Sequence, residues 1–212
     1  MKNRVVIVCN GVLYDALIGE ITSDDYVIGV DRAAYWLLSR GVTPQLAIGD
    51  FDSANPRELS RIKKSVSDTR VYHPEKDFTD TELAVQVAIE RHPSEIVILG
   101  GWGTRMDHTL ATLSLLEQGL LHKIPMSCRN ETNHIQLISR GRTIVKKRGG
   151  FTYISLLPNS ATITVTIRGL KYPLTHTTIR RGQTVCVSNE FLSDNATVTI
   201  HAGKALLIAS CD

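Results

Sequence analysis

The chain has 212 residues, of which 42% are hydrophobic and 21% are charged, and its formal net charge is +3. A chain of this length and composition can bury a sizeable core without disulfides or a structural metal. The small net charge argues against a nucleic-acid partner, and the apolar run near the N-terminus is too short for a signal peptide or a membrane span.

Four cysteines lie far apart in the sequence, at positions 9, 128, 186 and 211. Their spacing matches neither a metal-binding pattern nor a CxxC motif, and it indicates no disulfide framework. We therefore expect reduced thiols and a cytoplasmic protein.

The N-terminal part of the chain, up to about residue 125, alternates short apolar runs with segments of helical periodicity. Nearly continuous apolar runs are typical of strands buried on both faces of a parallel sheet. We expect such strands at residues 5–9, 26–30, 46–48, 70–73 and 95–99. Helices are expected at residues 32–41, 56–65, 80–92 and 107–119. The alternation predicts an α/β domain over residues 1–128, with a doubly wound, mostly parallel, Rossmann-like sheet.

The remainder of the chain has a different pattern. Segments rich in Thr, Val and Ile alternate with period two, and Gly, Pro and Asn separate them. Short strands with turn signals at this spacing predict an antiparallel β-sandwich or barrel over residues 129–212.

Aspartates gather where the expected strands of the first domain end. Asp31 follows the second strand, and Asp50 and Asp52 follow the third. Three more follow the fourth and fifth strands: Asp77, Asp80 and Asp107. Ligands of open α/β sheets bind beyond the carboxyl ends of the strands. We therefore expect all of these aspartates except Asp77 to converge on one crevice.

Carboxylates that share a crevice repel each other unless a cation neutralises them. Oxygen-only ligands favour a hard cation, with Mg²⁺ ahead of Ca²⁺ and Mn²⁺. Extended residues at i and i+2 project from the same face, so we expect Asp50 and Asp52 to reach one ion together, with Phe51 turned the other way. The alternative is that each aspartate forms a turn or caps a helix.

The segment "LGGWGTRMDH", residues 99–108, has features of a phosphate site. Its glycines let backbone N–H groups approach a ligand, and it leads into a helix whose positive end favours anions. Arg105 can bind a phosphate with two donors, and Lys76 is a second candidate. The glycine spacing matches neither a Walker A loop nor GxGxxG, so the loop by itself is a weak signal.

Several residues near these motifs have competing interpretations. Thr79 and Glu82 fit a capping box, and Asp80 can simply complement the helix dipole. His108 is suited to proton transfer, although a histidine in the first turn of an apolar helix is more often structural. Trp102 lies in a glycine-rich loop, where an aromatic side chain often packs on a ligand ring, but the sequence favours neither the presence nor the absence of this contact.

Three motifs, "GDFDS" (49–53), "KDFTDTELA" (76–84) and "GGWGTRMDHTLA" (100–111), resemble thiamine pyrophosphokinase in their order and spacing. "VDRAA" (30–34) is similar to the first acidic motif of that family. Its C-terminal substrate motifs are similar to "GLKYPL" (169–174) and "SNEF" (188–191). The resemblance covers nearly the whole chain.

This resemblance implies an enzyme in which the hydroxyl of thiamine attacks the β-phosphorus of ATP, the pyrophosphoryl group is transferred and AMP leaves. It implies that the α/β domain binds ATP and Mg²⁺ and that the C-terminal β domain binds thiamine. It also implies a homodimer with active sites at the subunit interface.

The resemblance also implies which residues form the site. Asp50, Asp52 and Asp80 would hold Mg²⁺ and, with Arg105, would be catalytic. The residues around ATP and its phosphates would be Asp31, Arg32, Lys76, Asp77, Thr79, Gly103, Thr104, Arg105, Asp107 and His108. The residues around thiamine would be Trp102, Tyr172, Ser188 and Asn189.

The chain departs from the family pattern at a few positions. Arg32 and Ala33 stand where glycines often follow the first aspartate, Thr104 replaces the second glycine of a GGR element, and Thr112 replaces an asparagine. We expect a phosphate loop of different shape and an additional phosphate contact from Arg32. Activity should survive, because every carboxylate remains.

Two other functions stay open at this point. Another Mg²⁺-dependent nucleotide enzyme, a kinase or a phosphohydrolase, would release ADP where a pyrophosphokinase releases AMP. A regulator would bind nucleotide or thiamine without turnover, but binding alone does not need so many carboxylates.

Overall fold

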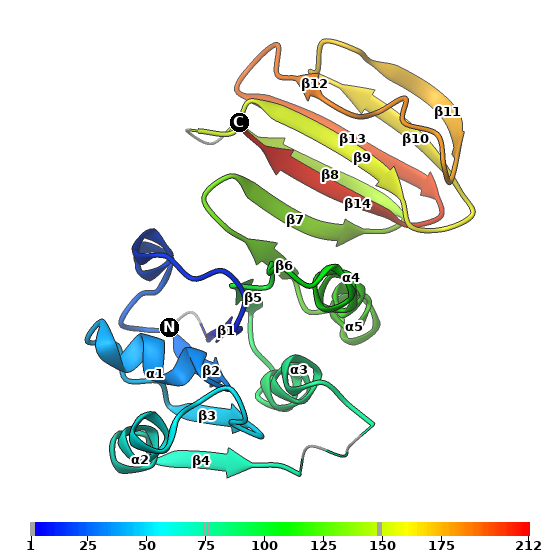
Figure 1. Ribbon diagram of the computed structural model, residues 1–212. Coiled ribbons are helices and arrows are strands. Elements are labelled where there is room, and N and C mark those ends of the chain that lie inside the picture. Colours follow the sequence, from blue (N-terminus) through cyan, green and yellow to red (C-terminus); the bar gives the residue numbers. More distant parts are fainter. Residues whose placement is uncertain (1–2, 74, 76, 148–149) are drawn as a thin grey trace. The chain divides into compact units, whose positions relative to one another are not determined.

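The computed structural model describes residues 3–73, 75, 77–147 and 150–212. The chain divides into two compact units, Met1–Glu131 and Thr132–Asp212 (Figure 1). The first unit mixes strands and helices, and the described residues of the second form strands and connecting loops.

Parallel strands form the sheet of the first unit. They are β1 (Arg4–Val8), β2 (Tyr26–Val30), β3 (Leu46–Gly49), β4 (Asp68–Val71), β5 (Glu95–Leu99) and β6 (Met126–Arg129). Their spatial order is β4-β3-β2-β1-β5-β6, and each neighbouring pair is parallel. The expected strands are confirmed with small shifts in their bounds. The pattern does not predict β6, because the segment "MSCR" is short and half polar.

The order of the strands makes the sheet doubly wound, as predicted. The chain builds outward from β1 to β4 and then returns to the other side of β1 with β5. The switch point of the sheet therefore lies between β1 and β5, and ligands of such sheets bind at this position.

Helices connect these strands. They are the 3₁₀-helix η1 (Asp15–Glu20), α1 (Ala33–Ser39), α2 (Pro56–Ser65), α3 (Asp80–Glu90), α4 (Met106–Ser114) and α5 (Leu116–His122). The expected helix at 107–119 is two helices that meet at Leu115, where the N–H is shared between the carbonyls of Ala111 and Thr112 and the last turn tightens. None of the helices in the described part of the chain is long and apolar enough to span a membrane.

Apolar side chains pack between the sheet and its helices. Figure 1 shows α1 and α2 on one side of the strands and α3 on the other. One buried cluster joins α1 and α2 to β3 through Ala34, Leu38, Ala47, Phe51, Ile62 and Val66. The turn after β3 is thus anchored in the core by its aromatic residue.

Two antiparallel sheets form the second unit. Their strands are β7 (Asn133–Ile138), β8 (Gly141–Lys146), β9 (Tyr153–Pro158), β10 (Thr162–Arg168), β11 (Leu174–Arg180), β12 (Asn189–Glu190), β13 (Asn195–Ala202) and β14 (Ala205–Ser210). One sheet has the order β12-β9-β14-β7 and the other β11-β10-β13-β8. Leu156 and Leu207 of the first share a core with Val165 and Val198 of the second. This is the antiparallel sandwich that the alternating pattern predicts.

Helix α2 begins with a complete capping box. The Asn55 side-chain oxygen accepts hydrogen bonds from the N–H groups of Arg57 and Glu58, each at 3.0 Å. The Glu58 carboxylate in turn accepts from the Asn55 N–H at 3.0 Å. Pro56 occupies the first helical position, where a missing N–H is harmless. These contacts place the start of α2 directly after the "GDFDS" segment.

Replacing Asn55 by alanine should lower the free energy of unfolding by about 0.5–2 kcal/mol, because two N–H groups lose their acceptor. Urea unfolding followed by circular dichroism measures the loss. Asp24→Ala is the control, since Asp24 is an exposed turn residue. Equal losses in the two variants would show that the cap does not stabilise the fold.

Candidate active site

A cavity of about 630 Å³ lies in the first unit, at the carboxyl ends of β1, β2, β3 and β5. This is the switch point of the sheet, and the volume is in the range of small-molecule sites. Residues that follow each of these strands line the cavity, together with the start of α3. Of the aspartates expected to converge, Asp31, Asp50, Asp52 and Asp80 therefore line a common space, whereas Asp107 does not.

The loops after β1 and β5 run against each other. The Gly11 N–H donates to the Gly100 carbonyl at 3.0 Å, and the Val12 N–H donates to the Trp102 carbonyl at 2.6 Å. A Cβ on Gly11 would lie 2.0 Å from the Trp102 carbonyl oxygen. Only glycine permits this approach, which holds the glycine-rich loop beside β1.

Three carboxylates form the acidic wall of the cavity. Asp31, Asp50 and Asp52 each offer an oxygen, and these oxygens lie within 4.8 Å of one another. Asp80, at the first position of α3, lines the same cavity. The carboxylates that lie closest together are therefore those of Asp31 and of the predicted pair, Asp50 and Asp52. Asp80 is not part of this cluster of three.

The local geometry of "GDFDS" differs from the expected extended backbone, and that prediction was wrong. Phe51 has a left-handed φ of 59°, and the Asp52 N–H donates to the Asp50 carboxylate at 3.1 Å. A turn, and not a pleat, therefore brings the two carboxylates together. Phe51 does point away from them, as expected: it is 3% exposed and packs against α1 and α2.

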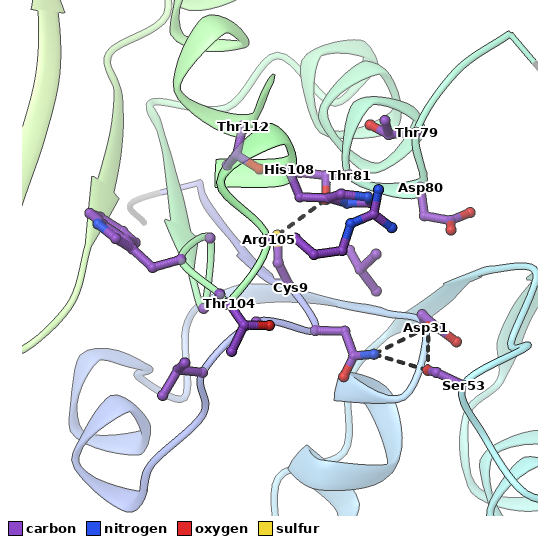
Figure 2. Close-up of a pocket in the computed structure, with 18 of the residues that line it drawn as sticks. Cys9, Asp31, Ser53, Thr79, Asp80, Thr81, Thr104, Arg105, His108 and Thr112 are labelled. Atoms are coloured by element: carbon purple, nitrogen blue, oxygen red, sulfur yellow. Dashed lines mark hydrogen bonds between the residues drawn. The ribbon is translucent and has the colours of Figure 1, made fainter. Parts of the chain in front are cut away.

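Asp31 is held by two neutral donors. Its Oδ2 accepts from the Ser53 hydroxyl at 2.5 Å and from the Asn10 amide at 3.3 Å, and Asn10 also donates to Ser53 at 2.9 Å (Figure 2). The residue is 8% exposed. Its other oxygen, Oδ1, is buried and has no hydrogen-bond partner among the described residues.

The electrostatic state of Asp31 follows from this environment. Burial raises the pKa of its carboxyl, and the negative charges of Asp52, Asp50 and Asp80 raise it further, while the hydrogen bond from Ser53 lowers it. The net direction is upward. An added proton or a cation would therefore stabilise this wall.

The start of α3 contributes two residues to the cavity. Thr79 caps the helix by accepting a hydrogen bond from the Glu82 N–H at 3.1 Å, and both Thr79 and Asp80 line the cavity. Asp77 is exposed and does not line it. Lys76 lies outside the described residues.

The glycine-rich loop after β5 lines the opposite part of the cavity. Its lining residues include Trp102, Gly103, Thr104, Arg105 and His108. The Gly103 N–H donates to the Thr109 hydroxyl at 3.3 Å, which ties the loop to α4. The residues predicted for this loop therefore lie together at the cavity.

Three of the residues expected around the phosphates form ion pairs with other side chains in this structure. The Arg105 guanidinium pairs with Asp107 at 2.6 Å, and both side chains are largely exposed. Asp107 does not line the cavity. The Arg32 guanidinium pairs with Glu58 of the α2 capping box at 2.8 Å, and Arg32 does not line the cavity either.

The lining residues that have no role in the sequence-based assignment include Cys9, Asn10, Ser53 and Thr81. Asn10 follows β1, and Ser53 ends the "GDFDS" motif at the end of β3. Their positions after strands could have identified both as site residues from the sequence. The Thr81 hydroxyl contacts the Cys9 sulfur at 3.5 Å (Figure 2). Burial raises the pKa of the Cys9 thiol to about 12, so this group stays protonated and is a poor nucleophile.

The predicted thiamine residues of the second unit also lie close together. The Asn189 side chain is clamped to Tyr172: it accepts from the Tyr172 N–H at 3.0 Å and donates to the Tyr172 carbonyl at 2.8 Å. Ser188 has a left-handed φ of 56°, and its N–H donates to the Ser155 hydroxyl at 3.0 Å. Asn189 is buried, whereas the Tyr172 ring is exposed. Trp102 belongs to the first unit and lines its cavity.

Known proteins are similar to this chain over nearly its whole length. The family model "Thiamin pyrophosphokinase, catalytic domain" matches residues 19–128, and "Thiamin pyrophosphokinase, vitamin B1 binding domain" matches residues 142–207. Thiamine pyrophosphokinase of Bacillus subtilis is 39% identical over 186 residues, which is 87% of each chain.

Solved structures agree with the sequence relatives. The crystal structure of the Bacillus subtilis thiamine pyrophosphokinase superimposes with a TM-score of 0.93 at 37% identity, covering 99% of this chain and all of the other. That of thiamin pyrophosphokinase from Geobacillus thermodenitrificans gives 0.90 at 32% identity, covering 99% and 98%. The chain therefore belongs to the thiamine pyrophosphokinase family.

Proposed function

We propose that this chain transfers the pyrophosphoryl group of ATP to the hydroxyl of thiamine, giving thiamine diphosphate and AMP, with Mg²⁺ as the cofactor. Family membership supports the reaction. The observation that carries the site is the group of three carboxylates at the switch point, where a buried Asp31 oxygen has no protein partner among the described residues.

The residues of this wall fit a hard divalent cation. All the donors are carboxylate oxygens, which Mg²⁺ prefers, and the Asp31 Oδ1 is buried without a donor in the described part of the chain. Asp31, Asp50 and Asp52 would hold the ion, and Asp80 would complete the set predicted from the sequence. Once bound there, Mg²⁺ would neutralise charge on the phosphate oxygens.

The glycine-rich loop and the start of α3 would position the phosphates. Backbone N–H groups near Gly103 and the first turn of α4 favour anions. Thr79, Thr104 and His108 line the cavity and can donate hydrogen bonds. Arg105 would exchange its exposed pair with Asp107 for a bidentate contact to phosphate. An exposed ion pair of this kind is weak enough for such an exchange.

The carboxylates would also serve proton transfer. Asp52 or Asp80 would accept the proton of the thiamine hydroxyl, and both line the cavity. As in phosphoryl transfer generally, most of the rate enhancement would come from positioning and charge neutralisation.

We assign the nucleotide to residues 1–128 and thiamine to residues 129–212. Trp102 would pack against the thiamine rings, and Tyr172, Ser188 and Asn189 would bind thiamine from the second domain. We propose a cytoplasmic homodimer, with active sites at the subunit interface and no nucleic-acid or membrane partner. The clamp between Asn189 and Tyr172 supports a rigid substrate loop in the second unit.

Product analysis tests the reaction directly. With ATP, Mg²⁺ and thiamine, the protein should release AMP and thiamine diphosphate in equal amounts, and removal of Mg²⁺ by a chelator should abolish both. Asp52→Ala should reduce the rate about a hundredfold or more, because a charged group at the reacting centre is lost.

Asp15→Ala is the matched control for this substitution, since Asp15 is an exposed residue paired with Arg40. Release of ADP would instead indicate a kinase or a phosphohydrolase. Equal activity of the Asp52 and Asp15 variants would contradict the assigned site.

Arg105 and Arg32 should behave in opposite ways when each is replaced by alanine. Arg105→Ala should lower kcat/KM at least about tenfold with little change in the urea midpoint, because its charge serves the phosphates. Arg32→Ala should lower the urea midpoint and leave kcat/KM nearly unchanged, because Arg32 supports Glu58 in the cap of α2. Steady-state kinetics and urea unfolding of both variants measure these effects. A large loss of kcat/KM in Arg32→Ala would instead indicate that Arg32 contacts the phosphates.

Ser53→Ala should weaken metal binding about tenfold, because the donor that orients the Asp31 carboxylate is lost. Binding of Mn²⁺ as a spectroscopic stand-in for Mg²⁺ can be followed by electron paramagnetic resonance without substrates. Ser39→Ala is the control, since its hydroxyl donates to the Trp36 carbonyl at an exposed position. Unchanged Mn²⁺ affinity in Ser53→Ala would exclude the positioning role.

A further inference from the structure

Two histidines of the second unit meet on its outer surface. His176 belongs to β11 and His201 to β13, and these strands flank β10 on its two sides. Their ring centroids are 4.5 Å apart and the rings are tilted by 50°. His176 is exposed and His201 is half-buried, so both are reachable from solvent. The family assignment uses neither residue.

Both histidines lie at irregularities in the strand pairing. Ile200 pairs with Val165 and Ala202 with Thr164, so His201 is an extra residue on β13. On the other side of β10, Thr177 pairs with Val165 and Leu174 with Ile167. Two residues of β11, Thr175 and His176, therefore stand against one residue of β10. Such bulges redirect side chains and are often found beside functional sites.

Thr166 on β10 joins the two bulges. Its hydroxyl oxygen accepts a hydrogen bond from the His176 N–H at 3.0 Å and contacts His201 Nε2 at 2.8 Å. Because Nε2 contacts Thr166, Nδ1 is the ring nitrogen of His201 that is left to bind a ligand. The His176 backbone is held at a left-handed φ of 45°, an uncommon conformation that brings its side chain across β10.

We propose that His176 and His201 together bind one divalent transition-metal ion of the Zn²⁺, Ni²⁺ and Cu²⁺ class. Imidazole nitrogens are preferred ligands of these ions. Two imidazoles bound to one ion at about 2.0–2.1 Å place their ring centres roughly 4.5–5 Å apart. The observed separation is at the short end of this range, and the exposed His176 ring can rotate to complete the geometry. Water would fill the remaining coordination positions.

This site is chemically distinct from the proposed Mg²⁺ site. The acidic wall of the first unit presents carboxylate oxygens, which suit a hard cation, whereas the histidine pair presents only nitrogen. An ion at the pair would connect β11 to β13 across β10. Because the ion binds the folded arrangement, it should also stabilise the folded protein.

Calorimetric titration of the untagged protein with Zn²⁺ tests the proposal, in excess Mg²⁺ so that the acidic wall is occupied. The wild-type chain should bind one equivalent through this pair and show a higher Tm with Zn²⁺. His176→Asn keeps a residue type that tolerates the left-handed backbone, and His201→Gln keeps a polar partner for Thr166. Each should weaken this binding at least tenfold and remove the Tm increase.

His122→Gln is the matched control, because His122 is an exposed histidine at the end of α5, and it should bind Zn²⁺ like the wild type. Circular dichroism without metal confirms that the variants are folded. Retention of wild-type binding by either His176→Asn or His201→Gln would overturn the proposal, as would a wild-type chain that binds no Zn²⁺ under these conditions.

Discussion

The candidate site depends on holding like charges together. Oxygens of Asp31, Asp50 and Asp52 lie within 4.8 Å of one another, an arrangement that Coulomb repulsion opposes. Neutral donors offset part of this repulsion: the Ser53 hydroxyl and the Asn10 amide bind Asp31, and the Asp52 N–H binds Asp50. The proposed Mg²⁺ would neutralise the charge that remains. Binding of the proposed ion would therefore be coupled to the local structure of these strand ends.

The turn at Phe51 links the carboxylates of Asp50 and Asp52 to the hydrophobic core. Phe51 adopts a left-handed conformation that is uncommon for a bulky residue, and its ring is buried against α1 and α2. Burial of an aromatic side chain stabilises by a few kcal/mol, on the order of the strain it must offset. The cap of α2 by Asn55 and the pair between Arg32 and Glu58 hold the next segment in place. Packing thus positions the two carboxylates that flank Phe51.

Much of the fold could be predicted because its signals are local. Apolar runs locate the strands of the first unit, and Pro56 locates the first residue of α2. The sequence is less informative where distant residues decide the outcome. The backbone around Phe51 is a turn because the core receives its ring, and Arg32 meets Glu58 because two elements far apart in sequence pack together. Thr166 likewise brings together two histidines that lie 25 positions apart, which no local pattern indicates.

The sequence by itself determined the fold class, the family and the inventory of chemical groups, since periodicity and motif spacing are properties of the chain. Only the tertiary structure decided which groups meet. It placed Asp31 with Asp50 and Asp52, and it left an Asp31 oxygen buried without a partner among the described residues. It also paired Arg105 with Asp107. The physical reason is that carboxylate clustering, burial and ion pairing depend on distances between strand ends, and those distances exist only once the sheet has formed.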